Sequence, residues 1–186
     1  MATIASNIQQ VHQRITQACA LSQRPVRSVT LLSVTKTFGP DAVREAFAAG
    51  ERRFGENYVQ EGVDKIAALA EQRPAHLAPL QLCLQVNISG EASKSGLAPD
   101  EVAEVARQVA ALPQLRLRGL MAIPEPAGDL EAQRAPHRAL RQLLEQLNAG
   151  GLALDTLSMG MSADMDAAIA EGATMVRVGS AIFGTR

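Results

Sequence analysis

The sequence predicts an α/β protein built as a (β/α)8 barrel of the TIM type, with about two strand–helix units missing. Apolar runs rich in Val, Leu and Thr alternate with helical patterns along the chain, which predicts a parallel sheet covered by helices. Residues 35–40, after the first strand, lack the glycine-rich fingerprint of a doubly wound dinucleotide fold, and this favours the closed barrel. With 186 residues, 47% of them apolar, residues 1–186 are expected to form a single domain around one core.

A leading helix is predicted at the N-terminus. Apolar residues recur every three or four positions at Ile4, Ile8, Val11, Ile15 and Cys19, which places them on one helical face. Cys19 is expected to be a small core residue and not a reactive thiol.

Strands and helices are predicted to alternate along the rest of the chain. The first strand, 28–36, ends at Lys36, and Gly39, Pro40 and Asp41 then open a helix that ends at Gly50. Further strands are predicted at 53–55, 82–88, 117–123, 156–159 and 174–178, and further helices around 59–69, 99–112, 130–147 and from residue 162.

These six strands are two fewer than a complete barrel needs. The shortfall falls near residues 71–80, where Glu71 to Pro79 has the composition of a loop. Either the barrel is truly shortened, or a further segment near Gln72 is passed over by the numbering. We favour the second explanation, because an open barrel would expose two strand edges.

The composition argues for a small-molecule partner in the cytoplasm. Eighteen Lys and Arg residues against nineteen Asp and Glu leave a net charge of −1, so no positive field attracts nucleic acid or anionic lipid. The absence of Trp and the single Tyr leave few side chains for base stacking. Two cysteines are too few for a disulfide scaffold, and neither a signal peptide nor an apolar run of ~20 residues for a membrane span is present.

Two loops of small residues are the best candidates for ligand binding. In barrels of this type the loops after the strands form the active face, and phosphate commonly binds after the last two strands, at unpaired N–H groups of helix starts. The corresponding loops are 158–165, which contains Ser162, and 179–184, which contains Gly179 and Ser180. A plain helix N-cap also explains Ser162, and a turn also explains Gly179, so both alternatives stay open.

Three further polar side chains lie at predicted strand ends or within a strand. Lys36 ends the first strand, which neighbours the last strand in a barrel, and desolvation there would make its amine a nucleophile toward an aldehyde; a solvated lysine is the alternative. Arg177 interrupts a strand covered on both faces, so it needs a specific acceptor, either a ligand or a structural ion partner. Asn57 is a weaker candidate that helix capping also explains.

Six segments, in order, carry a family resemblance: Ser33 to Thr37, Phe54 to Glu61, Ser93 to Gly96, Arg118 to Met121, Ser158 to Ser162, and Arg177 to Gly184. Together they resemble the pyridoxal phosphate homeostasis protein family. The resemblance spans nearly the whole chain and fails near residues 71–80, where the family has additional strands. It implies a barrel similar to the N-terminal domain of alanine racemase, with pyridoxal 5′-phosphate (PLP) held as an internal aldimine on Lys36.

The same resemblance implies roles for the other candidate residues. Ser162, Gly179 and Ser180 would hold the phosphate, Asn57 would line the pocket, and Arg177 would face the pyridine nitrogen. Ser180 stands where many members have Thr, and this difference keeps the hydroxyl.

The function implied is a monomeric carrier that keeps free PLP low and supplies PLP-dependent apoenzymes, without robust catalysis. An arginine at the pyridine nitrogen disfavours its protonation and weakens the ring as an electron sink. The chain also ends at Arg186 without the C-terminal domain from which a racemase takes its second acid/base group. The alternatives are a PLP-dependent amino-acid racemase, or a Schiff-base aldolase that acts on a sugar phosphate with the same lysine.

Overall fold

The computed structural model describes residues 3–34, 40–51, 54–55, 78–91, 96–113 and 115–184. Their strands form one parallel sheet in the order β2-β1-β6-β5-β4-β3. The strands are β1 (Thr30–Val34), β2 (Phe54–Gly55), β3 (Leu80–Gln85), β4 (Leu115–Met121), β5 (Thr156–Ser158) and β6 (Met175–Val178). The α-helices are α1 (Ile4–Leu21), α2 (Pro40–Ala48), α4 (Val102–Ala110), α5 (Leu130–Ala149), α6 (Met165–Ala170) and α7 (Ser180–Phe183).

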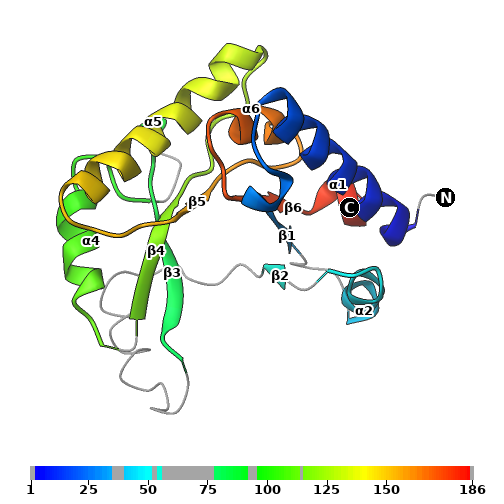
Figure 1. Cartoon of the computed structure of the whole chain (residues 1–186), viewed down its shortest axis with the longest axis horizontal. Coiled ribbons are helices and arrows are strands. Elements are labelled where there is room, and N and C mark those ends of the chain that lie inside the picture. Colours follow the sequence, from blue (N-terminus) through cyan, green and yellow to red (C-terminus); the bar gives the residue numbers. More distant parts are fainter. Residues whose placement is uncertain are drawn as a thin grey trace.

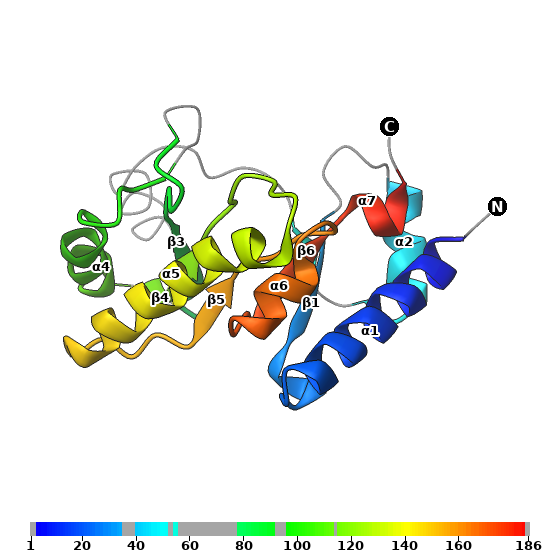
Figure 2. The same ribbon diagram turned by 90° about the horizontal axis from the view of Figure 1, so that it is seen from above.

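The helices follow the sheet in an arc along its outer side. Figure 1 shows α4, α5, α6 and α1 in succession around the strands, and Figure 2 shows the same helices side by side from above. A parallel sheet with crossover helices on its outer side is the arrangement of a (β/α) barrel, so the predicted fold class is confirmed.

The leading helix begins and packs as the sequence predicts. Thr3 is the N-cap of α1, and its hydroxyl accepts a hydrogen bond from the Ser6 amide at 3.1 Å. The predicted stripe is buried from Ile8 to Cys19, which is fully buried. This face contacts α6, α7 and α2, so α1 covers the region where the first and last strands meet.

The first and last strands pair directly. β1 and β6 are parallel neighbours in a register that matches Thr30 with Met175 and Ser33 with Val178. The carboxyl ends of the two strands therefore lie side by side, which brings Val34, the last residue of β1, beside the loop that follows β6.

The sheet described has six strands, with β2 and β3 at its two edges. Gln72, near which we favour a segment passed over by the numbering, lies outside the described residues, so this explanation stays a prediction. The predicted helix around 59–69 and the predicted loop at 71–77 lie outside the described residues.

β3 begins and ends earlier than the predicted strand 82–88. The Val86 amide still donates to the Met121 carbonyl of β4, but the neighbouring groups bond to a later segment. The Leu97 amide donates to the Gln85 carbonyl, and the Asn87 amide donates to the Leu97 carbonyl. Apolar residues beyond the strand, such as Ile88, therefore pack against the core from a turn. Apolar character alone does not distinguish these two cases.

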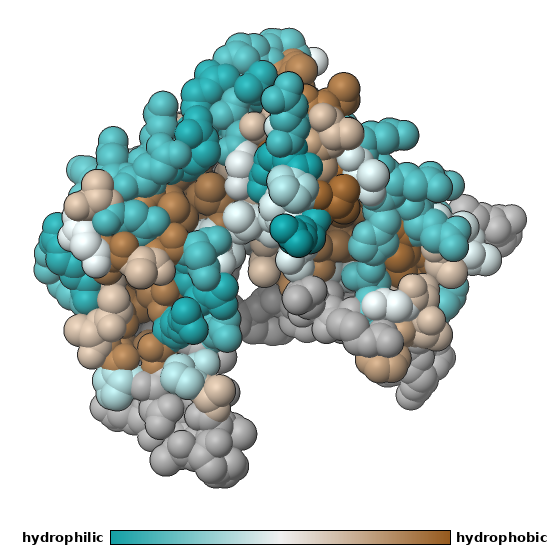
Figure 3. Space-filling model, in the orientation of Figure 1, coloured by the Kyte–Doolittle hydropathy of each residue, from teal (hydrophilic) through white to brown (hydrophobic). Residues whose placement is uncertain are grey.

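The core lies between the sheet and the helices. Figure 3 shows hydrophilic residues over the outer surface of the helices and apolar residues gathered below them. Leu120 of β4, Leu140 of α5, Val176 of β6 and Ile169 of α6 are all completely buried. Among the described residues no helix is long and apolar enough to span a lipid bilayer.

Gly119→Ala should destabilise the protein by at least about 2 kcal/mol, because a Cβ at Gly119 would collide with the carbonyl group of Thr156 on the neighbouring strand β5. Gly128→Ala is the matched control, since a Cβ there meets no atom within 4 Å. Urea unfolding of both variants measures the difference, and equal midpoints would contradict the close approach of β4 and β5.

Candidate functional site

Two loops meet at the carboxyl end of the sheet. One follows β5 and contains Ser162, and the other follows β6 and contains Gly179 and Ser180. The hydroxyl oxygens of Ser162 and Ser180 lie 3.2 Å apart, although the residues are 18 positions apart in sequence. The structure therefore brings together the two loops that the sequence singled out.

Gly179 lies where these loops approach the end of β1. A Cβ at this position would lie 3.1 Å from the Val34 carbonyl oxygen, tighter than ordinary contact. Glycine therefore allows the loop after β6 to pack closely on the last residue of β1. Lys36 is the second residue after Val34 in the sequence.

Lys36 and Asn57, two of the six candidate residues, lie outside the described residues. Their predicted roles stay predictions. Ser162, Arg177, Gly179 and Ser180 are all described, and they lie on or directly after the neighbouring strands β5 and β6.

The alternative reading of Ser162 as a helix N-cap is wrong. α6 begins three residues later at Met165, and Asp164 is its N-cap residue. The Asp164 carboxylate turns back to the loop, where Oδ1 accepts a hydrogen bond from the Met161 amide at 2.7 Å. Ser162 thus belongs to a turn before the helix, and its hydroxyl faces Ser180.

Gly160 anchors the start of this loop. Its φ of +91° lies in the left-handed region that favours glycine, and a Cβ there would lie 2.5 Å from the Ala168 Cβ. Its carbonyl oxygen accepts a hydrogen bond from the Arg177 amide at 2.9 Å. The loop is therefore fixed to β6 at its first turn.

Arg177 donates hydrogen bonds to neutral oxygen atoms only, as far as the described residues show. Nη1 donates to the carbonyl and hydroxyl oxygens of Ser158 at 2.6 and 2.9 Å, and Nη2 donates to the Ala122 carbonyl at 2.9 Å. Burial lowers the pKa of Arg177, and the negative charge of Asp164 partly offsets this. The structural ion pair considered from the sequence does not occur within the described part of the chain, so a largely buried cation is held without a contacting anion.

Arg14 of α1 holds the same loop from the outside. Nη1 donates to the Ser162 carbonyl oxygen, and Nε and Nη2 donate to the Asp166 carboxylate at 2.8–3.0 Å. A trans peptide holds its C=O and N–H antiparallel, so the Ala163 amide points away from Arg14. The sequence analysis did not identify Arg14, because nothing in a helical pattern distinguishes it from a solvated arginine.

His137 of α5 contacts the loop after β5 from the buried side. It is completely buried, and its Nε2 lies 2.9 Å from Oδ2 of Asp164. Burial raises the pKa of Asp164, but hydrogen bonds from His137 and the Met161 amide outweigh this, so the net shift is downward. The sequence analysis also missed His137; a single polar residue on the buried face of a predicted helix was the available signal.

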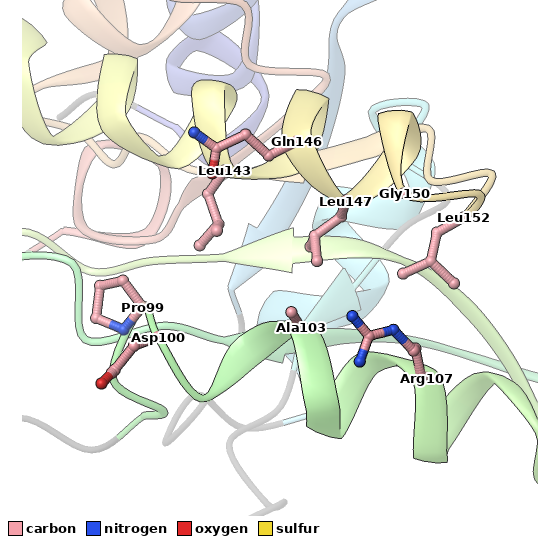
Figure 4. A pocket seen from close by; sticks show the side chains of 9 residues that line it. All are labelled: Pro99, Asp100, Ala103, Arg107, Leu143, Gln146, Leu147, Gly150 and Leu152. Atoms are coloured by element: carbon pink, nitrogen blue, oxygen red, sulfur yellow. The ribbon is translucent and has the colours of Figure 1, made fainter.

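A surface pocket lies elsewhere, between α4 and α5. Figure 4 shows side chains of both helices facing each other across it, among them Ala103, Arg107, Leu143 and Leu147. None of the predicted site residues lines it.

The chain is similar to known proteins along its whole length. Residues 61–186 match the model of the family described as alanine racemase, N-terminal domain. The pyridoxal phosphate homeostasis protein of Pseudomonas aeruginosa is 49% identical over 226 aligned positions, which cover 100% of this chain and 97% of that protein.

The chain belongs to the pyridoxal phosphate homeostasis protein family. The alignment includes all 186 residues, so at least 40 of its 226 positions have no residue in this chain. This difference agrees with the prediction that about two strand–helix units are missing from this sequence.

Solved structures agree with this membership. PipY of Synechococcus elongatus, in a structure described as having PLP bound, is 29% identical with a TM-score of 0.72, and the match covers 98% of this chain and 100% of PipY. Alanine racemase of Corynebacterium glutamicum is 17% identical with a TM-score of 0.67, over 98% of this chain and 61% of the racemase, and it shares the fold.

Asp164→Asn should lower stability at pH 7 by about 1–3 kcal/mol, because the variant loses the charged acceptor between His137 and the Met161 amide. The folded-state pKa of Asp164 lies below its ordinary 3.8, so the ionised carboxylate stabilises the fold above that pH and loses this effect as the pH falls through the lowered pKa. Urea unfolding at neutral and at acidic pH should show the difference shrinking in acid.

Asp129→Asn is the matched control, because the exposed N-cap of α5 accepts asparagine as well as aspartate. A constant difference between wild type and Asp164→Asn at all pH values would contradict the assignment.

Proposed function

We propose that this chain is a PLP-binding protein of intracellular PLP homeostasis, which holds the cofactor at the carboxyl end of β1, β5 and β6. Two features of the described residues support this. The hydroxyls of Ser162 and Ser180 face each other, and the hydrogen bonds of Arg177 within the described part of the chain go to neutral oxygens. The relatives named for pyridoxal phosphate homeostasis, and PipY with PLP bound, point to the same ligand.

The phosphate end of PLP fits the loops around Ser162 and Ser180. Two hydroxyls 3.2 Å apart both donate hydrogen bonds to a phosphate, and Gly179 leaves the approach from β1 free of a side chain. α6 and α7 are too short to supply a strong helix dipole, so hydroxyls and individual amides do most of the binding. This arrangement suits a chain of near-zero net charge.

The ring end of PLP fits Arg177. A cation held by neutral oxygens donates readily to a neutral pyridine nitrogen, and it disfavours protonation of that nitrogen. Such a ring is a poor electron sink, which argues against robust catalysis.

PLP supplies an aldehyde that reacts reversibly with primary amines. We assign that amine to Lys36, two residues beyond the last residue of β1, and we assign a pocket-lining role to Asn57. The protein is then a single-domain, monomeric, cytoplasmic carrier whose partners are PLP and the apoenzymes that take PLP from it.

Lys36→Ala should abolish the yellow colour of the protein purified with PLP, since the amine that binds the aldehyde is lost. Borohydride reduction followed by mass spectrometry should place a pyridoxyl group on Lys36 of the wild type and leave the variant unmodified. Lys65→Ala, at a lysine outside the six family segments, is the control and should stay yellow. Rapid amino-acid isomerisation, or cleavage of a sugar phosphate by a colourless protein, would instead support the racemase or the aldolase.

Ser162→Ala combined with Ser180→Ala should raise the Kd for PLP about tenfold or more, because two donors to a charged group are removed. The Kd for pyridoxal, which lacks the phosphate, should stay nearly constant. Spectrophotometric titration with both aldehydes gives the two constants, and equal losses for both would place the phosphate elsewhere. Ser6→Ala, on the exposed part of α1, is the control.

A further inference from the structure

The proposed function gives no role to His137. This residue is nevertheless completely buried beside the loop that contains Ser162. It is the eighth residue of α5, and its ring reaches the loop after β5 through a single hydrogen bond to Asp164. A buried imidazole costs free energy unless its polar atoms are satisfied. Its Nδ1 has no hydrogen-bond partner among the described residues, so its one polar contact there is the one to Asp164.

Asp164 connects His137 to the backbone of the loop after β5. Its two carboxylate oxygens are divided between His137 and the Met161 amide, so the ring and the loop backbone share one carboxylate. The same peptide unit contains the Gly160 carbonyl, which accepts a hydrogen bond from the Arg177 amide. The peptide between Gly160 and Met161 is thus held at both its oxygen and its nitrogen.

The orientation of the Gly160–Met161 peptide limits the positions that Ser162 can take. Ser162 follows Met161 directly, and its carbonyl oxygen is held by Arg14. The chain between the held Gly160–Met161 peptide and the held Ser162 carbonyl consists of Met161 and Ser162 alone, so the backbone of these two residues is restricted. From this position the Ser162 hydroxyl lies 3.2 Å from the hydroxyl of Ser180.

We propose that His137 is a positioning residue for phosphate binding: by donating from Nε2 to Asp164 it fixes the loop that presents the Ser162 hydroxyl to the phosphate of PLP. This inference rests on the proposed function. The role requires an N–H donor at the position of Nε2, since Asp164 is an acceptor there. An apolar side chain of similar size fills the space but leaves one carboxylate oxygen without its donor.

The test compares His137→Leu, which fills the volume without a donor, with His137→Gln, which returns an N–H near the position of Nε2. The measured quantity is the ratio of the Kd for PLP to the Kd for pyridoxal, obtained by spectrophotometric titration. His137→Leu should raise the Kd for PLP about tenfold and change that for pyridoxal by less than about twofold. His137→Gln should restore most of the preference for the phosphorylated aldehyde.

Leu144→Ala is the matched control, because Leu144 is a buried residue of α5 with no hydrogen bond to the loop. It should lower the thermal stability of the ligand-free protein without changing the ratio of the two constants. If His137→Leu does not fold, His137→Asn, whose shorter side chain does not reach Asp164, replaces it and the same ratio decides.

An unchanged ratio of the two Kd values in His137→Leu, including an equal loss of affinity for both aldehydes, would overturn the positioning role. A wild-type protein that does not bind PLP would overturn the proposed function itself. The two failures are therefore distinguished by the wild-type titration.

Discussion

The parallel pairing of β1 with β6 is the constraint on which the candidate site depends. Four residue pairs in register join a strand near the start of the chain to one near its end, and the carboxyl ends of the two strands lie side by side. The close contact of Gly179 with Val34 follows from this register, since it places the first residue after β6 against the last residue of β1. Without this pairing, the loops would have no neighbour from the first strand.

The strands that bear the candidate site lie inside the described sheet. In the strand order the three strands that bear the site, β1, β6 and β5, are paired on both sides, while β2 and β3 form the edges. The loops after β5 and β6 therefore follow strands that are hydrogen-bonded on both sides.

The loop after β5 is held from three directions by side chains or backbone of different elements. β6 holds the Gly160 carbonyl, α1 holds the Ser162 carbonyl through Arg14, and α5 holds Asp164 through His137. Since α6 has only six residues, its own N-terminus provides little of this rigidity. A loop fixed in advance loses less conformational entropy when an anion binds, which favours affinity.

The sequence by itself determined the alternation of strands and helices, the leading helix with its buried stripe, and the two small-residue loops. These features follow from local periodicity and from residues such as Gly179 and Pro40, whose backbone preferences act within a few positions. Only the tertiary structure decided that Asp164 and not Ser162 caps α6, that Arg177 contacts neutral oxygens, and that His137 and Arg14 reach the loop. Each of these contacts joins residues far apart in sequence or depends on the direction of a single side chain, and no local pattern of residues encodes that information.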